Sequence, residues 1–570
     1  MKIFVALSII ALIALLIQNK YKPSILFGGL ATIYYLLGFI ELQAWTSSYA
    51  NSSLLVLVLL LLVSISLEKT VVVEYFSKIL IKKDYKTSLL RLGVISSIFS
   101  AFLNNTAVVA SLMSVIKNNK HHLPSRLLIP LSYFAIFGGT MTLVGTSTNL
   151  IVNSFVIENG LPSLEMFDFF YVGVIITIVG TIALYIFSFL LPSYENINNK
   201  IEEHLIQTEV LKNSTLIGKS IKENKLRNLE YLFLLEIIRE NRSISPVSPD
   251  EKIVSGDKLI FSGDIKHLEI LKQFNGLRLG DGVDIKNLTL IDTIITPQSS
   301  LIGKKVKEAN FRSKFDSAIV SLRRGSLNIA KIGDEILQAG DRLVLSVGKE
   351  FENRENINKN FYVFNNIKQN QKLSSEKSFV VLIGFIATIL LSAMGIFKLL
   401  NALIIFMIFL LAIKAINFQE IQRRFPYGLF VIIGSSLAIS KVLISSGIAD
   451  SLAQLITDSF GSYGVYGSFI GVYLLTLVLT ELITNNAAAA LSFPIAYATA
   501  LSLGVNPLPF IFAVAYGASA SFILPYGYQT NLMVSSVGNY SAKDFVKIGS
   551  IVTIVYSAVV IIAIPIIFGF

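Results

Sequence analysis

The sequence predicts an α-helical protein that crosses a membrane many times, built as an inverted repeat around two small α+β domains. Of its 570 residues, 53% are hydrophobic and only 15% are charged, whereas soluble proteins carry about 25% charged residues. Apolar runs of roughly 15 to 20 residues, long enough to span a bilayer, recur on both sides of a polar block at 192–376. A polar pattern ending in Thr-Asn occurs once in each apolar part.

Each apolar part is expected to form five spans and one re-entrant hairpin. The first half, 1–191, has runs at 2–17, 24–41 and 53–67, an amphipathic stretch at 68–86, a hairpin at 88–116, an interrupted run at 127–156 and a last span at 169–191. The second half, 377–570, has runs at 377–397, 400–416 and 428–447, a hairpin at 466–500, an interrupted run at 507–536 and a last span at 548–569. The apolar start has no Ala-x-Ala cleavage site, so we expect a retained helix and not a signal peptide.

The placement of basic residues predicts the orientation. Lys and Arg cluster at 20–22, 69–91, 117–126, 423–424 and 543–547 and in the central block. The segments 42–52, 157–168 and 448–465, taken as loops, contain neither residue. By the positive-inside rule, the basic segments and the central domains face the cytoplasm, and both termini lie outside. The first hairpin then enters from the cytoplasmic side and the second from outside, which inverts the halves. We expect a bacterial cytoplasmic (inner) membrane.

The central block contains a repeat of its own. Leu216-Ile217-Gly218-Lys219 recurs as Leu301-Ile302-Gly303-Lys304, and Gly256-Asp257 recurs as Gly340-Asp341. The repeat predicts two copies of a small α+β domain, at 192–285 and 286–376. Turn signals separate β-like runs, which are Leu232–Ile238, Lys258–Phe261, Ala318–Leu322 and Arg342–Val347.

Four polar motifs interrupt the apolar sequence. The hairpins carry Asn104-Asn105-Thr106 and Asn485-Asn486-Ala487, and the interrupted runs carry Gly145–Asn149 and Gly527–Asn531. Unpaired amides and hydroxyls are costly in hydrocarbon, and paired broken helices indicate the binding site of a secondary transporter. Free N–H groups at a half-helix beginning attract an anion, while amide and backbone carbonyls can coordinate a hard cation such as Na⁺. The alternative is that these residues only join helices through hydrogen bonds.

Other polar residues are less informative. Lys441, inside an apolar run, has either a functional role or a scaffold and interface role. Glu481 either sets the local charge of the second hairpin or caps a helix. The four histidines, in polar segments without metal-ligand spacing, are expected at the surface; they are His121, His122, His204 and His267. The chain has no cysteine. Without a basic stripe interleaved with aromatic residues, nucleic acid is not an expected partner, and no nucleophile–base pair or metal cluster indicates an enzyme.

The paired motifs resemble those of the divalent anion/sodium symporters (DASS) of the ion-transporter superfamily, in the branch with two TrkA-C-type (RCK C-terminal) domains between its membrane halves. The resemblance implies that Asn105 with Gly145 binds one Na⁺ and that Asn486 with Gly527 binds a second. It also implies a homodimer and a small regulatory ligand for the central domains. The residues implied to face the substrate are Asn104, Thr106, Thr148, Asn149, Asn485, Thr530 and Asn531.

The expected function is Na⁺-coupled symport of a small divalent anion, sulfate first, by alternating access, with Na⁺ as coupling ion and no other cofactor. Import of a dianion is opposed by about 2.3 kcal/mol per charge per 100 mV, so it needs at least two cations. One alternative is a di- or tricarboxylate symporter. Another is a cation channel or antiporter regulated by the central domains. For an antiporter, the hairpins and interrupted helices offer only Glu481 as a proton-carrying carboxylate.

Overall fold

The structure is a computed structural model, and it divides into two compact units. The membrane unit comprises Met1–Ser193 and Asn370–Phe570, and the central unit comprises Tyr194–Gln369. The residues that the structure describes are 1–18, 21–70, 79–194, 205–226, 229, 232–240, 242–244, 247–263, 269–279, 290–296, 299–325, 327–329, 332–348, 350–351, 354, 357–363 and 373–570.

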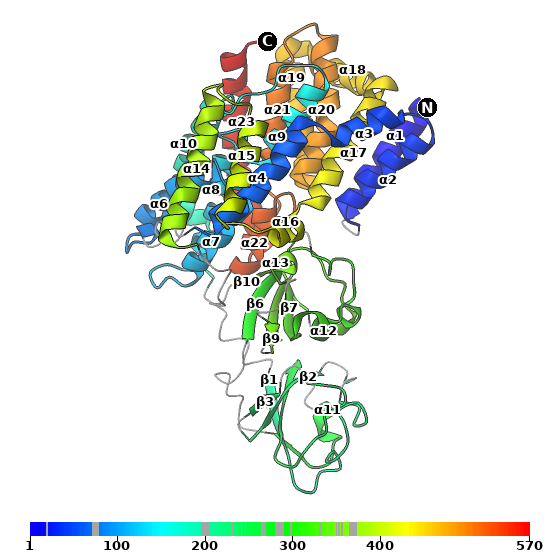
Figure 1. The fold of residues 1–570 in the computed structure, drawn as a ribbon, viewed down its shortest axis with the longest axis vertical. Coiled ribbons are helices and arrows are strands. Elements are labelled where there is room, and N and C mark those ends of the chain that lie inside the picture. Colours follow the sequence, from blue (N-terminus) through cyan, green and yellow to red (C-terminus); the bar gives the residue numbers. More distant parts are fainter. Residues whose placement is uncertain are drawn as a thin grey trace. The chain divides into compact units, whose positions relative to one another are not determined.

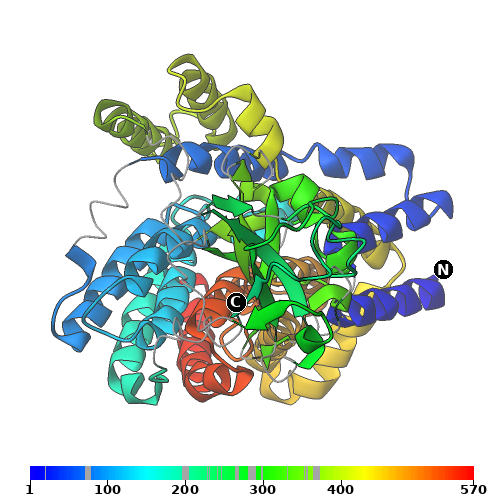
Figure 2. The same cartoon turned by 90° about the horizontal axis from the view of Figure 1, so that it is seen from below.

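The described part of the membrane unit is helical throughout (Figure 1), and Figure 2 shows it from below. Its first part contains α1 (Lys2–Gln18), α2 (Pro23–Leu36), α3 (Leu42–Tyr49), α4 (Ser52–Glu68), α6 (Tyr85–Ser100), α7 (Asn105–Lys117), α8 (Leu128–Gly139), α9 (Ser147–Glu158) and α10 (Phe170–Ile186). Its second part contains α14 (Ser375–Ala393), α15 (Leu399–Ala412), α16 (Phe418–Arg424), α17 (Tyr427–Ser445), α18 (Ile448–Phe460), α19 (Gly464–Leu482), α20 (Asn485–Ser502), α21 (Leu508–Ser519), α22 (Gln529–Gly538) and α23 (Ala542–Phe568).

The lengths and apolar composition of these helices confirm a polytopic membrane protein. Among the described residues, six helical segments are long and apolar enough to cross a bilayer. They are Leu42–Glu68, Phe170–Leu190, Ser375–Ala393, Tyr427–Ser445, Ile448–Leu482 and Ala542–Phe568. The shorter apolar helices include α1, α2, α7, α15 and α21. The expected amphipathic stretch at 68–86 lies partly outside the described residues.

Two segments predicted as loops are helical. The segment 42–52 contains α3, and 448–465 contains α18. In α18, Ala449 and Ala453 are buried and form a small cluster with Ala498 of α20. Small residues at this contact allow close helix packing. The helix is amphipathic, with polar residues between its apolar ones, so the sequence shows no long apolar run there.

The predicted interruptions are present, and two of them begin earlier than expected. The hairpin breaks fall between α6 and α7 and between α19 and α20, as the Asn motifs predict. The break in 127–156 begins after Gly139, and that in 507–536 begins after Ser519. Each break therefore starts several residues before its Gly–Asn motif. Side chains bond the backbone in both breaks, since Asn149 donates to the Thr142 carbonyl oxygen and Glu481 accepts from the N–H groups after Ser521.

Polar contacts join several of the segments that connect helices at one end of the membrane unit. We call this end the basic end. Lys69 Nζ, at the end of α4, lies 2.5 Å from Glu420 Oε1, and Arg424 Nη1 lies 2.8 Å from Glu68 Oε2. The backbone N–H of Leu373, just before α14, donates to the carbonyl oxygen of Lys69 at 3.1 Å. The connections after α4, before α14 and before α17 therefore lie together.

A second set of contacts lies at the other end of α4. Asn51 Nδ2 donates to Glu158 Oε2 at 3.2 Å, and Lys441 Nζ lies 2.6 Å from Glu158 Oε1. Both chain termini lie toward this end (Figure 1), where the ring of Phe570 contacts that of Tyr466 at the start of α19. The segments without Lys or Arg thus meet away from the basic end.

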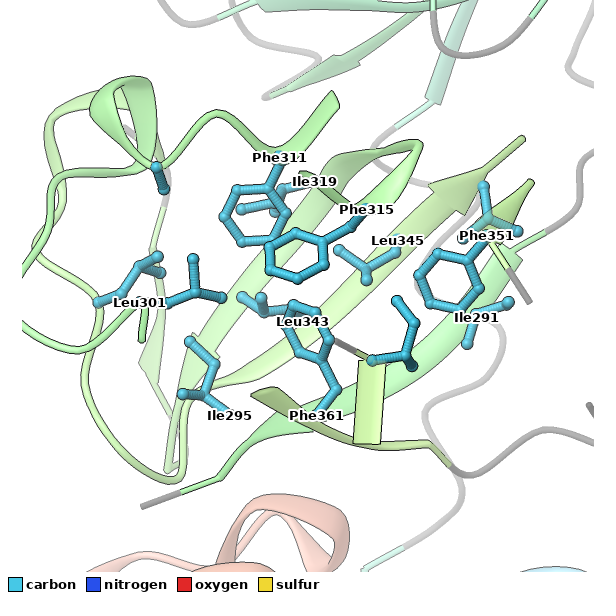
Figure 3. Close-up of a cluster of buried hydrophobic side chains, with 14 of the residues drawn as sticks. Ile291, Ile295, Leu301, Phe311, Phe315, Ile319, Leu343, Leu345, Phe351 and Phe361 are labelled. Atoms are coloured by element: carbon cyan, nitrogen blue, oxygen red, sulfur yellow. The ribbon is translucent and has the colours of Figure 1, made fainter. Parts of the chain in front are cut away.

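The central unit contains two five-stranded antiparallel sheets with the same topology. The first has the order β3-β2-β4-β1-β5, formed by β1 (Leu205–Val210), β2 (Leu232–Arg239), β3 (Arg242–Ile244), β4 (Lys258–Gly263) and β5 (Leu277–Leu279). The second has the equivalent order β8-β7-β9-β6-β10, formed by β6 (Leu290–Ile295), β7 (Ser317–Arg324), β8 (Leu327–Asn328), β9 (Arg342–Val347) and β10 (Phe361–Val363). Figure 3 shows the core of the second sheet, where Phe311 and Phe315 pack against Leu343 and Phe361.

The Gly-Asp signature of the central repeat has a structural role in both copies. Gly256 adopts a positive φ of 82°, which favours glycine. The next residue, Asp257, is fully buried and accepts from Arg239 Nε at 2.8 Å, while the same guanidinium contacts Glu251. Hydrogen bonding to Asp257 raises the pKa of Arg239, so the guanidinium stays charged. The equivalents in the second domain are Gly340, Asp341, Arg324 and Glu335.

Candidate functional site

The beginnings of four half-helices meet inside the membrane unit, and they meet in pairs across the two halves. Thr106 Oγ1 at the start of α7 donates to Gln529 Oε1 at the start of α22, at 3.3 Å. Ser147 Oγ at the start of α9 donates to Asn486 Oδ1 at the start of α20, at 2.9 Å. We call the meeting point of α7, α9, α20 and α22 the junction.

Tyr528, which was not among the predicted site residues, connects the two pairs. Its buried hydroxyl lies 2.8 Å from Asn105 Nδ2 and 3.0 Å from Thr146 Oγ1. The residue precedes α22 and follows Gly527, so its place inside the second Gly–Asn motif was the available signal. A phenol in hydrocarbon normally finds a hydrogen-bond partner, and here Asn105 and Thr146 are partners from the first half of the chain.

The structure shifts the correspondence between the two hairpin motifs by one residue. The first helical residues are Asn105 in α7 and Asn485 in α20. The cross-half contacts agree, because Thr106 and Asn486 each contact the first residue of the opposite broken helix. The counterpart of Asn104-Asn105-Thr106 is therefore Thr484-Asn485-Asn486, one residue before the predicted Asn485-Asn486-Ala487.

In the part of the chain that the structure describes, three of the four half-helices begin without a side-chain cap. Asn104 caps α7, since its Oδ1 accepts from Thr106 N at 2.9 Å. Within the described chain, α9, α20 and α22 begin without a side-chain cap. The first N–H groups of a helix have no intrahelical partner, and the helix dipole places partial positive charge there. The junction is therefore suited to an anion.

In the first half, short contacts fix Asn105 and the backbone after α8. Asn105 is buried, and its Oδ1 accepts from Ser100 Oγ at 2.6 Å. Asn149 Nδ2 donates to the carbonyl oxygen of Thr142 at 2.9 Å. A Cβ on Gly145 would lie 2.5 Å from the carbonyl oxygen of Gly139, so the backbone passes too closely there for any side chain.

In the second half, Asn485 joins the hairpin to the broken helix. Its backbone N–H donates to the carbonyl oxygen of Gly527 at 3.3 Å, and its Nδ2 donates to Thr148 Oγ1 at 3.1 Å. Thr530 and Asn531 are fully buried, and both accept from Ser132 Oγ of α8, at 2.8 and 2.6 Å. Thr530 and Asn531 therefore hold the two halves together at α8.

Glu481 anchors the backbone between α21 and α22. Its Oε1 accepts from the N–H groups of Phe522 and Ile523, both at 2.9 Å, and its Oε2 accepts from Leu524 N at 2.8 Å. Three consecutive amides thus converge on one buried carboxylate. Neither predicted role, a local charge or a helix cap, included this contact with the unwound segment of the second interrupted run.

The remaining polar residues predicted from the sequence, where the structure describes them, make local contacts outside the junction. Lys441 pairs with Glu158 at the end of α9 and donates to the carbonyl oxygen of Ala44 at 3.0 Å, which fits the scaffold and interface alternative. His122 Nε2 lies 2.8 Å from the carbonyl oxygen of Lys82. Within the described residues, no group of three His, Cys, Asp or Glu side chains could hold a metal ion. His204 and His267 lie outside the described residues.

Comparison with known proteins identifies the family. A family model described as CitMHS, citrate transporter, matches residues 3–517. The uncharacterized transporter sll0640 of Synechocystis sp. is 27% identical over 569 residues, which cover 95% of this chain and 92% of its own. Sodium/sulfate cotransporter 1 of Chlamydomonas reinhardtii is 26% identical over 365 residues, covering 61% of this chain and 41% of its own. Since the model matches well over half of its length, the chain belongs to the CitMHS citrate transporter family and is a membrane transporter, not an enzyme.

Proposed function

We propose that this protein is a Na⁺-coupled symporter of a small divalent anion, with sulfate as the first candidate. The observation that carries the proposal is the junction, where four half-helices from both halves begin side by side and three begin without a side-chain cap. Among the described residues that form its hydrogen bonds, all are neutral amides and hydroxyls. Helix dipoles and bound cations would then compensate the charge of the substrate.

Two cation sites would flank the anion. In the first half, Asn105 and Gly145 are the proposed ligands, near Ser100. In the second half, the helix beginnings favour Asn485 in the place predicted for Asn486, because Asn485 N already contacts the Gly527 carbonyl. Amide and carbonyl oxygens are suitable ligands for a hard cation. Two Na⁺ would balance a dianion, and a third would let the membrane potential drive uptake.

The proposed orientation places the basic end in the cytoplasm of a bacterial inner membrane and both termini outside. Two observations support this orientation. Lys69, Arg424 and Leu373 lie together at the basic end, and the segments 42–52 and 157–168 contain no Lys or Arg. The halves would then be inverted, as alternating access by an inverted repeat requires. The central domains, similar to TrkA-C domains in their signatures, would be cytoplasmic, bind a small regulatory ligand and act in a homodimer.

Names of relatives favour two substrate classes. The sodium/sulfate cotransporter name supports sulfate, and the citrate transporter family description supports a tricarboxylate as the second candidate. A proton antiporter is less well supported, because both oxygens of Glu481 already accept backbone hydrogen bonds.

Uptake of radiolabelled sulfate, citrate and succinate into proteoliposomes with and without an inward Na⁺ gradient tests the proposal. We expect sulfate uptake that rises at least tenfold with the gradient and is inhibited weakly by citrate. Citrate uptake without sulfate uptake would support the second candidate, and uptake of none of the three would reject both.

A further inference from the structure

The second half contains a compact set of oxygens beside Gly527. A Cβ placed on Gly527 would overlap the carbonyl oxygen of Thr480 and Ser521 Oγ. Both oxygens therefore lie against the same glycine Cα, and only glycine leaves the space between them open. We call this set, with Asn485 next to it, the Gly527 cradle.

The carbonyl oxygen in the cradle comes from a helix end. Thr480 belongs to the last turn of α19, which ends at Leu482. Carbonyls in the last turn of a helix have no intrahelical N–H partner, and the helix dipole places partial negative charge there. Both properties favour a cation.

Ser521 supplies the second, independent observation. Its side chain is fully buried, and within the described chain its Oγ has no hydrogen-bond partner. Buried hydroxyls are nearly always paired. Because Ser521 Oγ and the Thr480 carbonyl oxygen both lie beside the Gly527 Cα, the unpaired hydroxyl can serve as a ligand together with that carbonyl.

The corresponding hydroxyl in the first half is engaged. Asn149 Nδ2 donates to the Thr142 carbonyl just as Asn531 Nδ2 donates to the Ser521 carbonyl, so Thr142 and Ser521 correspond. Thr142 Oγ1 donates to the carbonyl oxygen of Ala101 and accepts from Gly145 N at 3.0 Å. Thr142 thus holds the backbone with its hydroxyl, whereas Ser521 does not.

Glu481 explains how Ser521 can remain unpaired. It directly follows Thr480 in the chain, and it binds the three amides that directly follow Ser521. The carboxylate therefore fixes both sides of the cradle relative to each other. In the first half, Ala101 lies at the corresponding hairpin position, so the Thr142 hydroxyl is needed to hold the backbone.

We infer that Ser521 Oγ is a direct ligand of a monovalent cation bound in the Gly527 cradle, with Thr480 O and Asn485, and that Glu481 is the positioning residue of this site. The two cation sites are therefore unequal, and the second binds Na⁺ more tightly because it has the additional side-chain ligand. This inference rests on the proposed cation coupling and names a ligand that neither polar motif contains.

The test measures Na⁺ binding separately from transport. The full chain, purified in detergent without sulfate, is titrated with NaCl at constant ionic strength in choline chloride, and the melting temperature is recorded. The Na⁺ concentration for half-maximal stabilisation should rise at least tenfold in Ser521→Ala. The matched control is Ser492→Ala, another fully buried serine without a partner among the described residues, on α20; this variant should titrate as the wild type does.

The outcomes are distinct. A Ser521→Ala titration within twofold of the wild type overturns the assignment of Ser521 while leaving cation coupling intact. A wild-type protein that Na⁺ does not stabilise, and whose sulfate uptake Na⁺ does not change, overturns the cation coupling itself and this inference with it. A tenfold rise in both Ser521→Ala and Ser492→Ala also contradicts the assignment, because it would reflect a general loss of packing.

Discussion

The chain contains two internal repeats, and they have diverged in opposite ways. In the central unit, both sheet domains keep the same network around a buried aspartate, with Arg239–Asp257 in one copy and Arg324–Asp341 in the other. In the membrane unit, the two halves repeat their helices but change the side chains at equivalent positions, with Thr142 against Ser521. Identical contacts indicate a shared structural requirement. Different contacts at equivalent positions of a repeated helix arrangement indicate that the two halves of the site have different functions.

The largest expected effect comes from the glycines that both membrane halves retain. Gly527→Ala should abolish Na⁺-dependent uptake, because the new Cβ would overlap Thr480 O and Ser521 Oγ. Gly145→Ala should do the same, with its Cβ 2.5 Å from the Gly139 carbonyl oxygen. The control is Gly29→Ala in α2, where a Cβ meets open space. Initial rates of sulfate uptake by equal amounts of reconstituted protein are the measurement, and a Gly527→Ala rate near that of Gly29→Ala would contradict the account.

Replacing the buried aspartate of the central repeat should lower the stability of the two copies by equal amounts. Asp257→Asn and Asp341→Asn each leave an arginine without its buried partner, which costs about 3–5 kcal/mol for fully buried pairs. The arginine side chains are 29% and 26% exposed, so we expect about 2 kcal/mol in each copy. Differential scanning calorimetry of the full chain should show similar shifts of the same transition. A large loss of stability in one variant only would contradict the equivalence of the two copies. Lys307→Ala, which removes an exposed ion pair, serves as the control.

Tyr528 tests the connection between the two halves. Tyr528→Phe removes the hydroxyl that contacts Asn105 and Thr146 but keeps the ring. Leaving a buried amide unpaired costs about 1–2 kcal/mol, which corresponds to roughly a tenfold increase in the KM for sulfate. Tyr466→Phe, which removes an exposed hydrogen bond to Ile561, should leave the KM unchanged. Equal KM values for Tyr528→Phe and the wild type would show that the hydroxyl does not shape the junction.

The smallest expected effect concerns the ion pair at the far end of α9. Lys441→Met leaves Glu158 with Asn51 as its remaining partner, and both paired side chains are partly exposed. We expect a two- to threefold lower uptake rate and recovery in the double variant Lys441→Met/Glu158→Gln, since the uncompensated charge is then removed. A double variant no better than Lys441→Met would assign the lysine a role beyond this pair.

The sequence predicts the helices and breaks of the membrane unit well, because apolar length and interrupted polar motifs have local causes. Runs such as 169–191 and 548–569 became α10 and α23, and strands β2, β4, β7 and β9 coincide with the four β-like runs. The helix α18 was missed because it is amphipathic: Ile448, Ala449, Ala453 and Ile456 are buried, but polar residues between them leave no long apolar run in the sequence.

The sequence predicted which motifs form the candidate site, but not which residues of the two halves correspond or contact each other. Asn105, Gly145 and Gly527 lie at the predicted interruptions, but motif spacing aligned Asn105 with Asn486, whereas the helix beginnings align it with Asn485. The contacts of Tyr528 and Glu481 join segments far apart in the chain. Periodicity and spacing carry no information about such partners, so only the three-dimensional structure identifies them.

In the proposed mechanism, the junction binds an anion together with cations held by Asn105 and Asn485. Its most direct test is the accumulation of radiolabelled sulfate in proteoliposomes under an imposed inward Na⁺ gradient, for the wild type, Asn105→Ala and Asn485→Ala. We predict accumulation above the external concentration in the wild type, its collapse when the gradient is dissipated, and its loss in both variants with unchanged amounts of folded protein. Equal accumulation with and without the Na⁺ gradient, or full accumulation in both variants, would contradict the account.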